Sequence, residues 1–399
     1  MSAQVVKIKD FSYRGHNFET LWIILDDHNS PPLLPLLFTT YLERFGIVYK
    51  SVEISDETNR KRISLLEPSE IEGATIRSYI NCLSNFLTYL DDYKINHQTL
   101  GIHASSACNE SFVRDYLNNV LPDSLDSYQS LTVHQAALRA YFNWLDYLEI
   151  RPRLKLEIYR KTRQKMEDKC SKQHYIQYIA RYRRTKLLNT CKTMAEKLIM
   201  RMGFEVGLRT SELTGLQIEG KYDLQKLFEQ LDNDDYKSIE HFRYWLHGRF
   251  TKHKKSRWIY FSRALLIDMR RYFDTERRWI INQSKSDDSC FFLRTDPGFI
   301  GTGIGKTHGS NVFRNRADSA GLDSYYSFHD LRHTFATELY HSEITNPDNR
   351  ETRSESAALL VVSQRLGHAI GKDGLAPAVT TKYIRLRIQM LEAERADNG

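Results

Sequence analysis

The most constraining feature of this sequence is a regular spacing of apolar residues within residues 73–93. Ile76, Ile80, Leu83, Phe86, Leu87 and Leu90 recur at intervals of three and four, the period of one face of an α-helix. Residues 131–148 repeat this pattern, and residues 110–120 form a shorter candidate helix. Because an amphipathic helix must bury its apolar face against another element, these segments predict a compact all-helical domain over residues 67–150.

The rest of the chain divides less clearly. Residues 1–66 are an N-terminal extension whose role the sequence does not reveal. Residues 151–170 begin with Arg-Pro-Arg, are strongly basic, and predict a linker. Residues 171–399 then form a second domain.

Two kinds of secondary structure are predicted within this second domain. Residues 194–206 predict a helix that ends at Gly207. The aromatic and β-branched runs 244–250 and 257–261 flank a polar stretch, which predicts a β-hairpin with a charged tip. The fold class is therefore expected to be mainly α with a small β-sheet, α+β.

Positive charge is concentrated in two blocks of a chain whose net charge is only +7. Residues 151–200 contain fifteen Lys or Arg and four acidic residues, and residues 243–278 contain eleven and three. Tyr residues lie in the first block, and Trp245 and Trp258 lie in the second. Such clustering is typical of a nucleic-acid-binding surface, although solvated helix faces would produce the same pattern.

Several function classes are disfavoured by composition. No apolar stretch approaches the roughly 20 residues of a membrane helix, and the first ten residues lack the apolar core of a signal peptide. The five cysteines form no Cys-x-x-Cys pair, which disfavours a disulfide framework and a structural zinc site. We therefore expect a cytoplasmic, nucleoid-associated protein with no membrane partner.

The segment with the most chemical information is 327–337, Ser-Phe-His-Asp-Leu-Arg-His-Thr-Phe-Ala-Thr. Its apolar residues mark one face of a helix, so His329 and Arg332, three residues apart, should project together from the other side. Arg209 follows the predicted helix end at Gly207, where a turn can direct its side chain into a cleft. Lys252 lies at the tip of the predicted hairpin.

Five motifs occur in a fixed order: Gly-Leu-Arg-x-Ser-Glu-Leu, Lys-x-x-Lys-x-Arg, His-x-Leu-Arg-His-Thr-Phe-Ala-Thr, Leu-Gly-His and Thr-Thr-Lys-Tyr. In this order they resemble the tyrosine recombinase, or phage integrase, family over residues 171–387. Residues 67–149 are similar to the helical core-binding domain of that family. The resemblance implies that this domain clamps DNA and precedes a mixed catalytic domain of the integrase type. The catalytic residues that it implies are Arg209, Lys252, His329, Arg332, His368 and Tyr383.

The resemblance implies site-specific cutting and rejoining of DNA through a 3′-phosphotyrosyl intermediate, for integration or excision of a mobile element, with no cofactor and no metal. Tyr383 would be the nucleophile and His329 its base. Arg209 and Arg332 suit the charge that develops on the phosphate, because guanidinium groups bind oxyanions bidentately. Lys252 could protonate the departing 5′ oxygen. Glu212 and His333 also match family positions, and we expect structural roles for both.

The implied partner is double-stranded DNA, on which four copies would assemble as a homo-tetramer from a free monomer or weak oligomer, with accessory DNA-bending proteins as further candidates. Residues expected to contact DNA come from the two basic blocks: Arg151, Arg153, Arg181, Arg183, Arg184, Lys254, Lys255 and Arg257.

Alternatives remain at the level of sequence. Tyr325 and Tyr326 are rival nucleophiles, because the spacing around Tyr383 is one residue tighter than the commonest family form. A type IB topoisomerase-like enzyme or a non-catalytic DNA-binding regulator would also explain part of the pattern. His329 and His333 have the i, i+4 spacing of zinc ligands, but the intervening glutamate is absent and Arg332 would repel a cation. Residues 301–307 resemble a phosphate-binding loop, but their glycine spacing is wrong.

Overall fold

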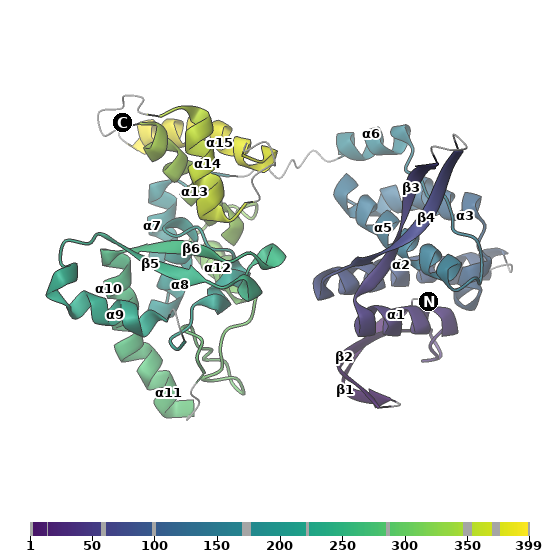
Figure 1. Ribbon diagram of the computed structural model, residues 1–399, viewed down its shortest axis with the longest axis horizontal. Coiled ribbons are helices and arrows are strands. Elements are labelled where there is room, and N and C mark those ends of the chain that lie inside the picture. The colour runs from purple at the N-terminus through teal and green to yellow at the C-terminus, as the bar shows by residue number, and fades with distance from the viewer. Residues whose placement is uncertain are drawn as a thin grey trace. The chain divides into compact units, whose positions relative to one another are not determined.

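The computed structural model describes residues 3–13, 15–56, 61–97, 101–169, 177–220, 223–284, 288–345, 353–368 and 376–397. The chain divides into two compact units, residues 1–173 and 174–399 (Figure 1). Each unit is described separately below.

Unit 1 combines helices with two β-hairpins. Its elements are β1 (Gln4–Tyr13), β2 (His16–Leu25), α1 (Leu33–Phe45), β3 (Ile47–Asp56), β4 (Lys61–Glu70), α2 (Gly73–His97), α3 (Glu110–Asp115), α4 (Leu121–Ser124), α5 (Tyr128–Tyr147) and α6 (Arg160–Lys169). β1 pairs antiparallel with β2, and β3 with β4.

The core of unit 1 lies between α2 and α5, as the apolar spacing predicts. Leu83 and Leu87 of α2 are completely buried, and so is Leu145 of α5. Phe38 and Leu42 of α1 belong to the same core, so this part of the predicted N-terminal extension packs onto the helices. The expected linker also differs, because Leu156 and Met166 are buried in this core and α6 is part of unit 1.

Unit 2 is mainly helical with one hairpin. Its elements are α7 (Arg181–Asn189), α8 (Met194–Phe204), α9 (Leu224–Asp232), β5 (His241–Leu246), β6 (Arg257–Ser262), α10 (Arg263–Tyr272), α11 (Arg278–Ser284), α12 (His308–Ser319), α13 (Phe328–Ile344), α14 (Glu355–Leu366) and α15 (Ala378–Asp397). β5 and β6 pair antiparallel, with Tyr244 opposite Ile259.

Helix α13 is central to unit 2, because it packs against α8, α14 and α15. The approach to α8 is close: a Cβ on Gly203 would lie only 2.7 Å from Cβ of Leu331. The chain then turns at Gly207, whose φ of 75° favours glycine and which leaves no room for a side chain beside Phe335. Sequence segments that are far apart therefore meet around α13.

The observed architecture confirms the predicted fold class, mainly α with small antiparallel sheets. The predicted helix is present as α8 but ends at Phe204, two residues earlier than expected. The charged hairpin is present as well, although β5 begins at His241 and ends before a short turn at Gly248–Phe250. Among the described residues, no helix is long and apolar enough to cross a bilayer.

Candidate active site

Glu212 is the centre around which the site is built. It lies in the helical turn Thr210–Gly215, which Arg209 precedes, and its carboxylate is completely buried. Arg257 donates two hydrogen bonds to it, at 2.9 and 2.7 Å. Arg209 donates a third from Nη1 at 2.9 Å, and Arg332 lies 3.4 Å away. Burial alone would raise the pKa of Glu212, but these arginines outweigh it and lower the pKa to about 2.

Arg332 is held by the ends of two other helices. It is 1% exposed, and its guanidinium donates hydrogen bonds to the carbonyl of Gly207, after α8, and to the carbonyl of Leu366, at the end of α14, the latter at 2.6 Å. Burial lowers the pKa of Arg332, and the carboxylate of Glu212 opposes this effect. The contacts fix this side chain in one orientation.

The start of α13 is fixed by a reciprocal cap, which places His329 and Arg332. Both the backbone N–H and the hydroxyl of Ser327 donate to a carboxylate oxygen of Asp330, at 2.8 and 2.7 Å. The other oxygen of Asp330 accepts from the backbone N–H of Gln177 at 3.1 Å. The cap formed by Ser327 and Asp330 therefore fixes the direction in which His329 and Arg332 project.

Tyr383 meets α13 through His333. Its side chain is 1% exposed, and its hydroxyl lies 3.3 Å from Nδ1 of His333. Burial raises the pKa of Tyr383 to about 12, and the positive charges of Arg332 and Arg209 partly oppose this rise. The hydroxyl of the predicted nucleophile therefore contacts His333, for which we expected a structural role. Its spacing of four residues from His329 is the sequence signal that could have identified it.

His329 and His368 lie in the same electrostatic environment. The ring centroid of His329 is 4.3 Å from that of His333. Desolvation and then the charges of Arg332 and Arg209 lower the pKa of His329 to about 4, although the side chain is exposed at the edge of a cavity. The same causes lower the pKa of the half-buried His368 to about 4. Both rings are therefore neutral at neutral pH.

Lys252 is exposed in the turn between β5 and β6. Its charge contributes to the lowered pKa of His329, which places it within electrostatic reach of the other predicted residues. Lys254 and Lys255 are exposed beside it. All six residues predicted to be catalytic are thus linked by hydrogen bonds or by mutual electrostatic effects.

The residues expected to contact DNA fall into two groups. Arg181, Lys254 and Lys255 are exposed. The others are committed to protein partners: Arg151 to the carbonyls of Ser106 and Cys108, Arg153 to the carbonyl of Ser64, Arg183 to the hydroxyl of Tyr326, Arg184 to Glu338, and Arg257 to Glu212. Arg257 is 7% exposed and its guanidinium pairs with the buried carboxylate of Glu212, so its DNA contact stays a prediction.

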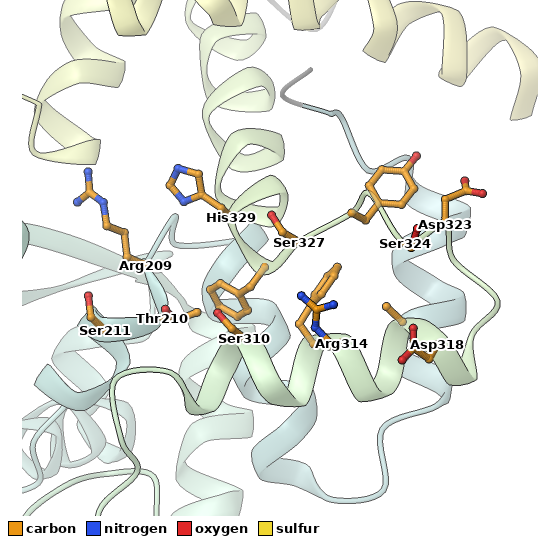
Figure 2. Close-up of a pocket in the computed structure, with 14 residues that line it drawn as sticks. Arg209, Thr210, Ser211, Ser310, Arg314, Asp318, Asp323, Ser324, Ser327 and His329 are labelled. Carbon is orange, nitrogen blue, oxygen red and sulfur yellow. The ribbon is translucent and has the colours of Figure 1, made fainter. Parts of the chain in front are cut away.

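A cavity of about 300 Å³ opens beside Arg209 and His329. Figure 2 shows Ser310 and Arg314 projecting from α12 on one side of it, and Ser324 and Ser327 on the other. Its polar lining combines the guanidinium groups of Arg209 and Arg314 with several hydroxyl groups and with the carboxylates of Asp318 and Asp323.

The alternative assignments find less support in this geometry. Tyr325 is 53% exposed and its hydroxyl donates to Asp323, whereas that of Tyr326 accepts from Arg183. Within the described part of the chain, no three His, Cys, Asp or Glu side chains gather as a metal-binding group. The Gly-Lys-Asp-Gly loop after His368 lies outside the described residues.

Three comparisons relate this chain to known proteins. Residues 178–348 match the model of the phage integrase family. The chain is 24% identical to the tyrosine recombinase XerA of Saccharolobus solfataricus over 271 residues, which cover 66% of this chain and 72% of that protein. Its fold is similar to that of the XerH site-specific recombinase bound to a palindromic difH substrate, with a TM-score of 0.52, 16% identity, and coverage of 81% of this chain and 79% of that one. Residues 178–348 of this chain are therefore similar to the phage integrase family, and the chain as a whole resembles tyrosine recombinases.

Proposed function

We propose that this chain recombines double-stranded DNA at specific sites through a covalent bond between Tyr383 and a 3′-phosphate. The observation that carries the proposal is the position of the Tyr383 hydroxyl, 3.3 Å from a histidine and close enough to Arg209 and Arg332 for their charges to oppose the rise in pKa that burial causes. A phenol with an ordinary pKa near 10 is a poor nucleophile at neutral pH, so such neighbours are what the chemistry requires.

The proposed cleavage step forms a bond between Tyr383 Oη and phosphorus and breaks the bond between phosphorus and the 5′ oxygen. Arg209, Arg332 and His368 hydrogen-bond to the non-bridging oxygens, where negative charge increases. Because the hydroxyl contacts His333, we assign the phenol proton to Nδ1 of His333 in place of His329. Lys252 gives a proton to the leaving 5′ oxygen.

Religation reverses these transfers with the 5′ hydroxyl of a partner strand. The phosphodiester bond energy is retained in the tyrosyl link, so no ATP is consumed. Joining two duplexes requires four such cleavages, and we propose a homo-tetramer on DNA that serves integration or excision of a mobile element, with accessory DNA-bending proteins as further partners. The exposed Arg181, Lys254 and Lys255, together with Arg314 beside the cavity, are the proposed backbone contacts.

The test is Tyr383→Phe on a nicked substrate that traps the covalent complex. Only the nucleophilic oxygen is removed, so the variant should bind DNA as the wild type does and form no adduct. Tyr325→Phe and Tyr326→Phe are the matched controls and should still form it. An adduct that persists in Tyr383→Phe and disappears in one of the controls would transfer the role to that tyrosine.

A second assay distinguishes recombination from the alternative, a type IB topoisomerase activity. A recombinase should join two DNA molecules that each carry the target site. Relaxation of supercoiled DNA without any joined product would support the topoisomerase instead.

A further inference from the structure

Thr380 is completely buried near the start of α15, three residues before Tyr383. Residues three apart share a face of a helix, so Thr380 and Tyr383 approach α13 and α14 from the same side. The hydroxyl oxygen of Thr380 lies 3.1 Å from Nδ1 of His368. It also lies 3.1 Å from the hydroxyl of Ser363 on α14. Thr380 therefore joins the helix of the nucleophile to the histidine of the Leu-Gly-His motif.

Ser363 fixes the same histidine through its backbone. Its carbonyl accepts a hydrogen bond from the N–H of His368 at 2.9 Å. Between them Gly367 turns the chain with φ 67°. The backbone of His368 is thus fixed by Ser363 and Gly367. The hydrogen bond between the Thr380 hydroxyl and Nδ1 then orients the imidazole ring and favours one of its two tautomers.

The ring of His368 is neutral, so the open question is which of its two nitrogens carries the proton. Desolvation and the charges of Arg332 and Arg209 keep the pKa of His368 low, so at neutral pH the imidazole has one N–H. A hydroxyl also has a single proton to donate. If Ser363 donates to Thr380 and Thr380 donates to Nδ1, the ring must carry its proton on Nε2.

We propose that Thr380 is a positioning residue that holds His368 in the tautomer protonated on Nε2, so that Nε2–H can donate to a non-bridging oxygen of the scissile phosphate. In this proposal the Ser363 hydroxyl donates to Thr380, and the Thr380 hydroxyl donates to Nδ1 of His368. The phosphate contact rests on the proposed function, whereas the tautomer is a property of the free protein.

The first test reads the tautomer directly. Long-range ¹H–¹⁵N spectra of the full-length protein labelled with ¹⁵N-histidine distinguish a protonated from an unprotonated ring nitrogen, and the signals lost in His368→Gln identify this residue. We expect Nε2–H in the wild type and in Thr380→Ser, and a shift toward Nδ1–H in Thr380→Val. Nδ1–H in the wild type, or an unchanged pattern in Thr380→Val, would overturn the proposal.

The second test measures single-turnover cleavage of the trapping substrate. Thr380→Val should cleave roughly 10- to 100-fold more slowly, the effect of losing one hydrogen bond to a charged transition state, and Thr380→Ser should recover most of the rate. Because Thr380 acts through His368, the double variant Thr380→Val/His368→Gln should be no slower than His368→Gln. Fully additive losses would show that Thr380 acts by another route.

Thr39→Val is the matched control for a purely structural effect. Thr39 is also completely buried, and its hydroxyl donates only to the backbone carbonyl of Leu36 in unit 1. It should leave the cleavage rate and the His368 signals unchanged. If the wild type shows the Nε2–H tautomer and yet forms no covalent complex with DNA, the proposed function fails while the assignment of Thr380 stands.

Discussion

Glu212 forms ion pairs with three arginines of the site. One buried carboxylate faces Arg209, Arg257 and Arg332, and two of these arginines are themselves almost completely buried. Removing one member of a buried ion pair leaves the other charge uncompensated, which costs far more than the pair contributes. The arginines that would bind phosphate are therefore held together by a residue that need not touch DNA.

Glu212→Gln should lower the free energy of unfolding by about 3–5 kcal/mol, because three guanidinium groups lose their shared negative charge. Urea denaturation measures this. Glu338→Gln is the control: Glu338 pairs with Arg184 but is 37% exposed, so its loss should cost no more than about 1 kcal/mol. Equal losses in the two variants would mean that burial of Glu212 has no special energetic effect.

Acid sensitivity should also depend on Glu212. Its folded-state pKa of about 2 lies below the unfolded value of 4.5, so its ionised form stabilises the fold fully above about pH 4.5, and this contribution is lost as the pH falls toward 2. Wild-type stability should therefore fall more steeply than that of Glu212→Gln over this interval. Parallel stability curves from pH 4.5 to 2 would contradict the assignment.

Residue types and their order were enough to single out Arg209, His329 and Arg332, because each lies in a short motif whose local geometry the sequence specifies. The contact between His333 and Tyr383 could not be predicted in this way. It depends on how α15 packs against α13, fifty residues away along the chain. The same holds for Thr380, whose partners lie on α14 and beyond its end.

At the scale of elements, the β5–β6 hairpin carries the proposed general acid. An alkoxide leaving group needs a proton, whereas a thiolate, with a pKa nearer 8.5, leaves largely unaided. Lys252→Ala should therefore cleave ordinary DNA roughly 10²- to 10⁴-fold more slowly and recover most of that loss when sulfur replaces the bridging 5′ oxygen. Single-turnover rates on the two substrates provide the measurement.

Arg209→Ala is the control for the experiment with the sulfur-containing substrate. Its proposed partners are the non-bridging oxygens, which the sulfur substrate leaves unchanged, so no recovery is expected. Failure of Lys252→Ala to recover would instead direct attention to Lys254 and Lys255, which are exposed on the same turn.

Helix α7 carries both exposed and ion-paired basic residues. Arg181 and Lys186 are exposed, whereas Arg184 is paired with Glu338. Replacing both Arg181 and Lys186 with Gln should flatten the plot of log affinity against log salt by up to about 0.9 per lost phosphate contact. Arg184→Gln/Glu338→Gln changes no net charge and should keep the slope. An unaltered slope in the first variant would mean that this face of α7 does not bind DNA.

At the scale of the whole molecule, the N-terminal segment is where sequence reasoning was least informative. Its two hairpins contain few buried positions, so the alternation that marks a half-buried strand is weak there, and β1 has no completely buried residue among those described. The burial of Ile24, Phe38, Leu42 and Val48 in the same core as α2 and α5 shows that the segment belongs to unit 1. That relation is long-range and leaves no local sequence pattern.

The two units have separate hydrophobic cores, since no buried residue in the described ranges belongs to the core of both. Leu87 is completely buried in the core of unit 1 and Leu265 in that of unit 2, so either change to Ala should cost about 2–5 kcal/mol. Because a cavity loosens the packing around it, Leu87→Ala should speed amide hydrogen exchange in α2 and α5 and leave α8 and α10 as in the wild type. Leu265→Ala should do the reverse. Mass spectrometry of exchanged peptides separates these helices within one sample, and equal acceleration in both units by either substitution would show that the chain unfolds as one cooperative body.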